Sequence, residues 1–354
     1  MSVEALVRAG QRIGYDSQAR YQLTCAVSRR SDTRIQIGSE PPGWVVLCDA
    51  PPESVPVLRG LDGTVPAGQV LSRHGGDPQV WTPIFEVMLE RGLLSPTGAA
   101  PGADLDPLLR PEWWALARVH GPAAAHRLLS TRAEALVEVR GSGRLPGAVA
   151  VLLAAAGVGH VHQRLDRRLR PGDHLDEVSG PTGHPSDAAD EADRWTVNRR
   201  LRAVSGLVRT HPPATHHHPD LVLLASDVTE PAMEAAELCL DAVAHLVATA
   251  GGAQAVLGPL VLPGRSACLR CLALHRMDAD PEWMPTRSPT RRAPAPPAAL
   301  VAAVAASAAV EVLALVDGAH VPATVDGTVE WRYGELTPRR RSWYLHPECG
   351  CQGG

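Results

Sequence analysis

Four cysteines in the second half of the chain have the spacing of metal ligands. Cys268 and Cys271 form one pair with two residues between them, and Cys349 and Cys351 form a second pair with one residue between them. Thiolate pairs at these spacings suit a tetrahedral zinc ion, and four thiolates leave no open coordination position for a substrate. We therefore predict a structural zinc site, with His346 and His275 as substitute ligands if one cysteine does not take part.

A disulfide pair is the alternative interpretation of the same four residues. The other cysteines, Cys25, Cys48 and Cys239, are isolated in the sequence, and no signal peptide opens the chain. Both features favour a reducing compartment, so we expect free thiols and a cytoplasmic location.

The composition bounds the class of protein. The 354 residues are 45% hydrophobic and carry a formal net charge of -4, which is enough chain for two domains and gives no basic surplus. No apolar stretch reaches the roughly 20 uninterrupted residues of a membrane helix, so we expect no membrane span. All 34 basic residues are arginine, which excludes any chemistry that requires a lysine.

The first third of the chain predicts a small domain and a linker. We interpret residues 1–30 as a loose N-terminal segment and residues 31–95 as a winged helix, with a strand hairpin at residues 34–47 and a third helix at residues 78–91. Residues 96–112 are rich in Pro, Gly, Ala and Asp and indicate a linker.

Residues 113–354 predict an α/β domain. A strand ending at Val139, a turn at Gly141-Ser142-Gly143, an apolar helix from Pro146 and a further strand follow one another, which is the order of a βαβ unit with parallel strands. The apolar run 220–225 is typical of a strand buried on both faces, and Asp227 follows it.

These residues resemble the ThiF/MoeB superfamily, the fold of ubiquitin-activating enzymes. The resemblance rests on the glycine turn, the segment 220–227, the run 256–264 before the first cysteine pair, and the last cysteine pair. Joined to a winged helix, the chain looks like the ThiF-like, leader-peptide-binding partner proteins of azoline-forming cyclodehydratases. That resemblance implies a precursor leader peptide and a YcaO-type subunit as partners, and it leaves a homodimer open.

Active members of the superfamily bind ATP and adenylate a carboxylate, but this sequence departs from their motif. Gly141 and Gly143 are present, whereas Pro146 occupies the third glycine position and lacks an N–H donor for a phosphate. The expected lysine cannot exist here, and Asp227 is the residue that matches the magnesium-side aspartate. We therefore interpret Gly141, Gly143 and Asp227 as vestigial nucleotide-binding residues and expect no ATP binding and no catalysis.

The winged helix could bind either a peptide or DNA. The predicted third helix carries Glu86, Glu90 and Arg91, and the hairpin carries Glu40, so the basic face that a DNA-binding regulator requires is not evident. We instead expect an extended peptide to add to a free strand edge, between Arg34, Ile35 and Ile37 of the hairpin and Ile84 and Met88 of the helix. A recognition scaffold in ribosomal peptide natural-product biosynthesis is therefore the predicted function, with an active adenylyltransferase and a DNA-binding regulator as alternatives.

Overall fold

The structure, a computed structural model, describes residues 15–39, 44–96, 105–142, 144–165, 199–211, 218–226, 232–283, 295–335 and 337–351. The chain divides into two compact units, residues 1–129 and residues 130–354, and each is described here by itself. The division lies inside a helix and not at residue 113, where we expected the second domain to begin. The expected linker at 96–112 contains the start of a helix at Arg110.

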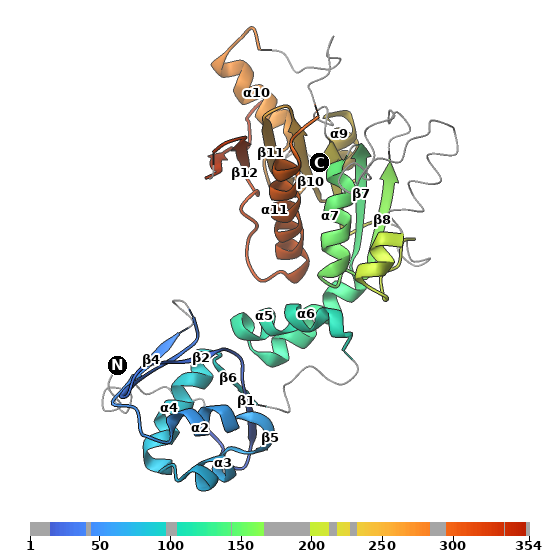
Figure 1. The fold of residues 1–354 in the computed structure, drawn as a ribbon. Helices are drawn as coiled ribbons and strands as arrows, with labels where there is room; N and C mark the ends of the chain where they lie inside the picture. Colours follow the sequence, from blue (N-terminus) through green and yellow to red (C-terminus); the bar gives the residue numbers. More distant parts are fainter. Residues whose placement is uncertain are drawn as a thin grey trace. The chain divides into compact units, whose positions relative to one another are not determined.

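The first unit is a mixture of short strands and helices (Figure 1). Its elements are β1 (Arg20–Leu23), β2 (Val27–Ser31), β3 (Arg34–Ile37), β4 (Val45–Cys48), α2 (Ser54–Gly60), β5 (Asp62–Pro66), α3 (Ala67–His74), α4 (Pro78–Glu90), β6 (Leu94–Pro96), η2 (Pro107–Leu109), α5 (Arg110–His120) and α6 (Pro122–Glu134). Two antiparallel sheets form, in the orders β5-β1-β6 and β2-β3-β4.

Residues 15–30 are not the loose segment that we expected. Strand β1 is the central strand of its sheet, and Tyr21 is only 3% exposed. The core of this unit gathers apolar residues of both sheets around α4, whose Trp81, Ile84, Phe85 and Met88 are buried. Asp77 is the N-cap residue of α4, and its side chain accepts a hydrogen bond from the Gln79 amide.

The second unit is built on a seven-stranded sheet in the order β13-β12-β11-β10-β9-β7-β8. Its elements are β7 (Leu136–Ser142), α7 (Arg144–Ala155), β8 (His160–Leu165), β9 (Leu221–Ser226), α9 (Ala232–Leu240), β10 (His245–Gly251), β11 (Gln254–Val261), α10 (Leu269–Ala279), α11 (Ala298–Asp317), β12 (Gly327–Arg332) and β13 (Arg339–Ser342). Strands β8, β7, β9 and β10 are parallel, and the remaining strands are antiparallel. The predicted α/β class and βαβ unit are confirmed.

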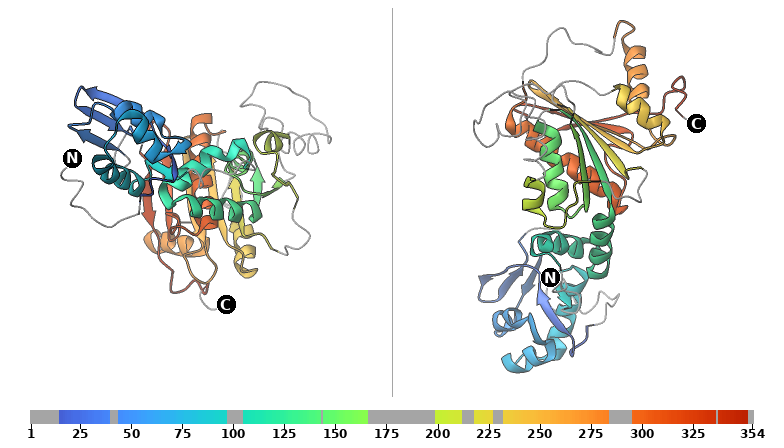
Figure 2. Two further views of the ribbon diagram at one scale, coloured as in Figure 1. Left: turned by 90° about the horizontal axis from the view of Figure 1, so that it is seen from below. Right: turned by 90° about the vertical axis from the view of Figure 1, so that its right-hand side faces the viewer.

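Helices cover both faces of this sheet, as strand β9 illustrates. Its Leu221 and Leu223 face the core that contains α7 and α11, whereas Val222 and Leu224 face the core that contains α9 and α10. Helices α7 and α11 lie side by side on one face, and α9 and α10 lie on the other (Figures 1 and 2). A continuous apolar run is therefore what a strand in this position needs.

Helix α11 is the longest and most apolar helix among the described residues. Its 20 residues are long and apolar enough to cross a membrane by length and composition alone. Its Val304, Ala308 and Val312 are fully buried against the sheet, and the buried Glu311 accepts hydrogen bonds from the amides of Ala323 and Thr324. Helix α11 thus packs as a core helix of this unit.

Candidate functional site

The four predicted metal-ligating cysteines lie together in the second unit. Cys268 directly precedes α10 and Cys271 lies in its first turn, while Cys349 and Cys351 follow β13. The Sγ atoms of Cys268 and Cys349 are 3.5 Å apart, as are those of Cys271 and Cys351, and Cys268 and Cys271 are separated by 3.9 Å. All four sulfur atoms lie within 4.8 Å of one another, and none is in a disulfide.

This arrangement fits a tetrahedral zinc ion. Four sulfur atoms at the usual 2.3 Å from a central zinc are about 3.8 Å apart, close to the separations found here. The His346 amide also donates to Cys271 Sγ at 3.4 Å, the kind of second contact that orients a metal ligand. Cys268, Cys271, Cys349 and Cys351 could therefore hold a metal ion such as zinc, and neither His346 nor His275 is needed as a substitute.

Burial and mutual contacts shift the pKa values of these thiols in different directions. A hydrogen bond from the neighbouring Cys239 thiol lowers the pKa of Cys268 to about 4. Backbone amides lower this pKa as well, and burial raises it by less. Burial, followed by the neighbouring thiols, raises the pKa of Cys349 to about 11, and the same two causes raise the pKa of Cys351. A bound dication would deprotonate its thiol ligands.

The predicted nucleotide turn is described only in part. Gly141 is the next-to-last residue of β7 and has a φ of 133°, a conformation that suits glycine, while Gly143 and Asp227 lie outside the described residues. After the turn, Leu145, Pro146 and Gly147 are buried in the first turn of α7, and Arg144 donates to the Pro296 carbonyl. Pro146 therefore removes one of the N–H groups that a helix N-terminus offers to a phosphate.

Strand β8 contains no carboxylate side chain. Gln163 stands near its end, and both atoms of the Gln163 amide are buried without a hydrogen-bond partner. A buried, unpartnered amide is costly unless another group satisfies it. Strand β8 lies on one side of β7 and β9 lies on the other, so the order of the strands reverses between β7 and β9. The carboxyl ends of the strands at such a reversal are the usual ligand position in this architecture.

Sequence reasoning missed a charged cluster on β7 and β8. Glu138 is 8% exposed and accepts from Arg140 Nε at 2.6 Å, and Arg164 Nη1 lies 3.4 Å from it. Burial alone would raise the pKa of Glu138, but its contacts with His162 and Arg140 outweigh burial and lower the pKa to about 2. The alternation Val137, Glu138, Val139, Arg140 could have indicated this cluster, because alternate residues of a strand point to the same face of the sheet.

The residues predicted to bind a peptide are mostly core residues. Strand β3 is paired on both sides, by β2 and by β4, so Arg34–Ile37 does not form the free edge that we expected. The side chains of Ile35, Ile37, Ile84 and Met88 are at most 3% exposed, and only Arg34 of the predicted set is exposed. The free edge of this sheet beside α4 belongs instead to β4, with which no second described strand pairs.

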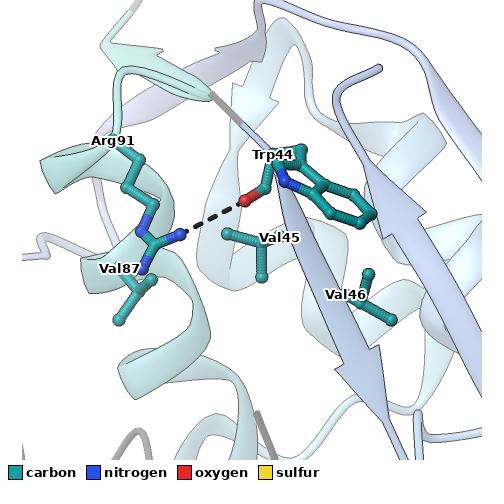
Figure 3. A pocket seen from close by; sticks show the side chains of 5 residues that line it. All are labelled: Trp44, Val45, Val46, Val87 and Arg91. Carbon is teal, nitrogen blue, oxygen red and sulfur yellow. Dashed lines mark hydrogen bonds between the residues drawn. The ribbon is translucent and has the colours of Figure 1, made fainter. Parts of the chain in front are cut away.

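A pocket of about 200 Å³ lies between β4 and the end of α4. Trp44, Val45 and Val46 line it from β4 and the residue before it, and Val87 and Arg91 line it from α4 and its C-cap (Figure 3). Arg91 Nη1 donates to the Trp44 carbonyl at 3.2 Å, and the Arg30 guanidinium lies 4.7 Å from the centre of a Trp44 ring. The pocket is therefore mostly apolar, with Arg91 in its lining and the Arg30 guanidinium against Trp44.

Comparisons with known proteins identify the fold. No protein-family model and no curated protein sequence matches the chain. The crystal structure of E. coli MccB with ATP is similar at a TM-score of 0.65 and 15% identity, over 94% of this chain and 99% of that chain. The microcin C7 biosynthetic enzyme MccB in complex with N-formylated MccA gives 0.64 and 14%, over the same shares. PaaA gives 0.58 and 15%, over 91% of this chain and 99% of that chain.

The chain therefore has the fold of MccB over nearly its whole length. At this low identity the likeness shows the fold alone.

Proposed function

We propose that this protein recognises a precursor leader peptide in ribosomal peptide natural-product biosynthesis and delivers it to a YcaO-type subunit in the cytoplasm, without catalysing a reaction itself. The observation that carries this proposal is the apolar pocket beside the free edge of β4. An extended peptide can pair with such an edge through its backbone and place alternate side chains in an adjoining pocket.

The pocket has features that suit this use. Val46 is partly exposed on β4, and it lines the pocket together with Val87 and Arg91. A peptide strand that pairs with β4 would therefore also contact these side chains of α4 and its C-cap. MccB, which has the same fold, has been crystallised with N-formylated MccA, and N-formylation is a modification of a peptide's N-terminus. A peptide ligand is therefore compatible with this fold.

The experiment is a binding assay with the full chain. A labelled precursor peptide encoded beside this gene is titrated with the protein and followed by fluorescence polarisation, and a neighbouring YcaO-type protein is tested for co-purification. Saturable binding of the peptide supports the proposal. Absence of peptide binding at protein concentrations well above micromolar would contradict it.

An adenylyltransferase is the second candidate, and two observations favour it. MccB has been crystallised with ATP, and the unpartnered Gln163 amide of this chain lies near the strand end where a nucleotide would bind. The missing lysine and Pro146 weigh against this candidate. ATP-pyrophosphate exchange that depends on the precursor peptide would favour it over the scaffold.

A DNA-binding regulator is the third candidate. Strand β2, which sequence reasoning did not find, places Arg29 and Arg30 on the exposed hairpin together with Arg34. The hairpin is therefore more basic than the residues 34–47 indicated. Binding of duplex DNA with a steep dependence on salt concentration, and without peptide binding, would favour this candidate.

A further inference from the structure

One stripe of α10 carries three side chains that can bind metal ions. Cys271, His275 and Asp278 are spaced i, i+4 and i+7, so they lie on the same side of the helix. The first belongs to the four-cysteine cluster. The other two gather with His346 into a second group, and the ligating atoms of His275, Asp278 and His346 lie within 4.8 Å of one another.

The contacts within this second group indicate which atom of each side chain could bind a metal ion. Asp278 Oδ2 and His346 Nε2 are 2.9 Å apart, which is near the roughly 3 Å between two donors at right angles and 2.1 Å from one metal ion. His275 Nε2 donates to the Tyr344 carbonyl at 2.9 Å, which leaves His275 Nδ1 as the atom with a lone pair. The two imidazole rings are in contact, with centroids 4.8 Å apart.

We propose that His275, Asp278 and His346 form a second metal site, for a first-row divalent cation, separate from the four cysteines. Two imidazoles and one carboxylate are ligands that zinc, nickel, cobalt and iron accept, whereas magnesium and calcium prefer oxygen ligands alone. Asp278 is exposed, and its side chain opens the group to solvent, so a cation can enter without unfolding. Three protein ligands leave coordination positions for water or a further ligand.

Cation binding requires one proton to move. Without a cation, His346 Nδ1 accepts from the Glu348 amide at 3.1 Å, so Nε2 carries the proton that is shared with Asp278. When Nε2 binds the cation, the ring proton moves to Nδ1, and the hydrogen bond from the Glu348 amide to Nδ1 is lost. No net proton is then lost from the ring, and the cation takes the place of the hydrogen bond between His346 and Asp278.

The test counts metal ions on the full chain. The protein is purified under reducing conditions, stripped with a chelator, and titrated with Co²⁺ in millimolar Mg²⁺. Native mass spectrometry counts the bound ions, and the intense near-ultraviolet absorption of cobalt thiolates reports the four-cysteine site. We expect two bound Co²⁺ ions, of which the double variant His275→Ala/Asp278→Asn loses the one that gives no thiolate absorption.

The matched control is Asp280→Asn, an exposed carboxylate at the end of the same helix, which keeps both ions. Thiolate absorption in the double variant shows that α10 is still folded. A single bound ion that resides on thiolates, a second ion that survives the double variant, or a second ion that binds only at a large excess of Co²⁺ would overturn the proposal. Because peptide binding is measured separately, this result does not depend on the proposed function.

Discussion

Gly141 lies so close to Ala225 on the neighbouring strand that a Cβ atom at position 141 would overlap the Ala225 carbonyl oxygen. The glycine of the predicted nucleotide turn is thus required by the packing of β7 against β9. Its presence says nothing about ATP, because the sheet would need it in either case.

Gly141→Ala should therefore destabilise the protein whether or not it binds nucleotide. We expect a loss of roughly 3 kcal/mol or more in the free energy of unfolding, because backbone atoms would have to move apart. Denaturant unfolding of the full chain measures this. Gly206→Ala is the control, since an added Cβ there meets nothing within 4 Å, and equal stability of the two variants would contradict the argument.

Removal of one zinc ligand should release the metal. Cys271→Ser and Cys349→Ser should each reduce the thiolate-bound metal below one ion per chain. Both should also lower the melting temperature, because structural zinc contributes roughly 10 kcal/mol or more to the folding free energy of small domains. Elemental analysis and calorimetry measure both. Cys48→Ser, on β4 in the other unit, should change neither quantity. Unchanged metal content in the ligand variants would rule the site out.

ATP should bind negligibly. The chain has no lysine for the phosphates, and Pro146 removes one N–H donor at the start of α7. Calorimetry with ATP and magnesium should give no heat beyond dilution, and no pyrophosphate exchange should occur. Exchange that is lost in Asp227→Ala would reverse this interpretation and favour the adenylyltransferase.

A charge in the β4 pocket should weaken peptide binding. Val46→Asp removes an apolar lining residue and places a carboxylate in the same pocket as the Arg91 guanidinium, so the pocket no longer suits an apolar side chain of the peptide and the dissociation constant should rise about tenfold or more. Ser28→Asp adds the same charge on β2 at the opposite edge and should have little effect. Fluorescence polarisation with the precursor peptide measures both. Equal loss in the two variants would indicate a charge effect without a pocket.

Glu138 should make stability depend on pH in acid. Its folded pKa of about 2 is below its ordinary value of 4.5, so its stabilisation is present above pH 4.5 and is lost as the pH falls toward 2. Glu138→Gln should lower the free energy of unfolding at pH 7 by on the order of 2 kcal/mol, and the difference from the unaltered protein should shrink in acid. Glu134→Gln, at an exposed position, is the control. A difference that is constant from pH 7 to pH 3 would contradict this.

The helices and apolar strands could be predicted because their patterns are local. The predicted hairpin and third helix agree with β3, β4 and α4 to within a few residues, and the cysteine pairs gather as expected. Strand β2 (Val27–Ser31) could not be found in this way, because four of its five residues are exposed and polar. Without β2, strand β3 looks like an edge, and this is why the peptide site was expected at Ile35 and Ile37.

The pocket and the second group of ligands were also beyond sequence reasoning. Trp44 and Arg91 are 47 residues apart, and their hydrogen bond depends on how β4 packs against α4. His346 lies 68 residues from Asp278, and their contact follows from the return of the chain to α10 after β13. The sequence indicated His346 only as a substitute ligand of the zinc site, because its contact with Asp278 depends on the fold.

The four-cysteine cluster also sets an order in time. A ribosome makes Cys268 and Cys271 first, and Cys349 follows Cys268 by 81 residues. While synthesis continues, α10 therefore holds only two of the four thiols, and the buried contacts of Cys349 do not yet exist. A chain that stops between the two cysteine pairs would present an open pair of thiols, so the cluster closes only in molecules that contain both pairs.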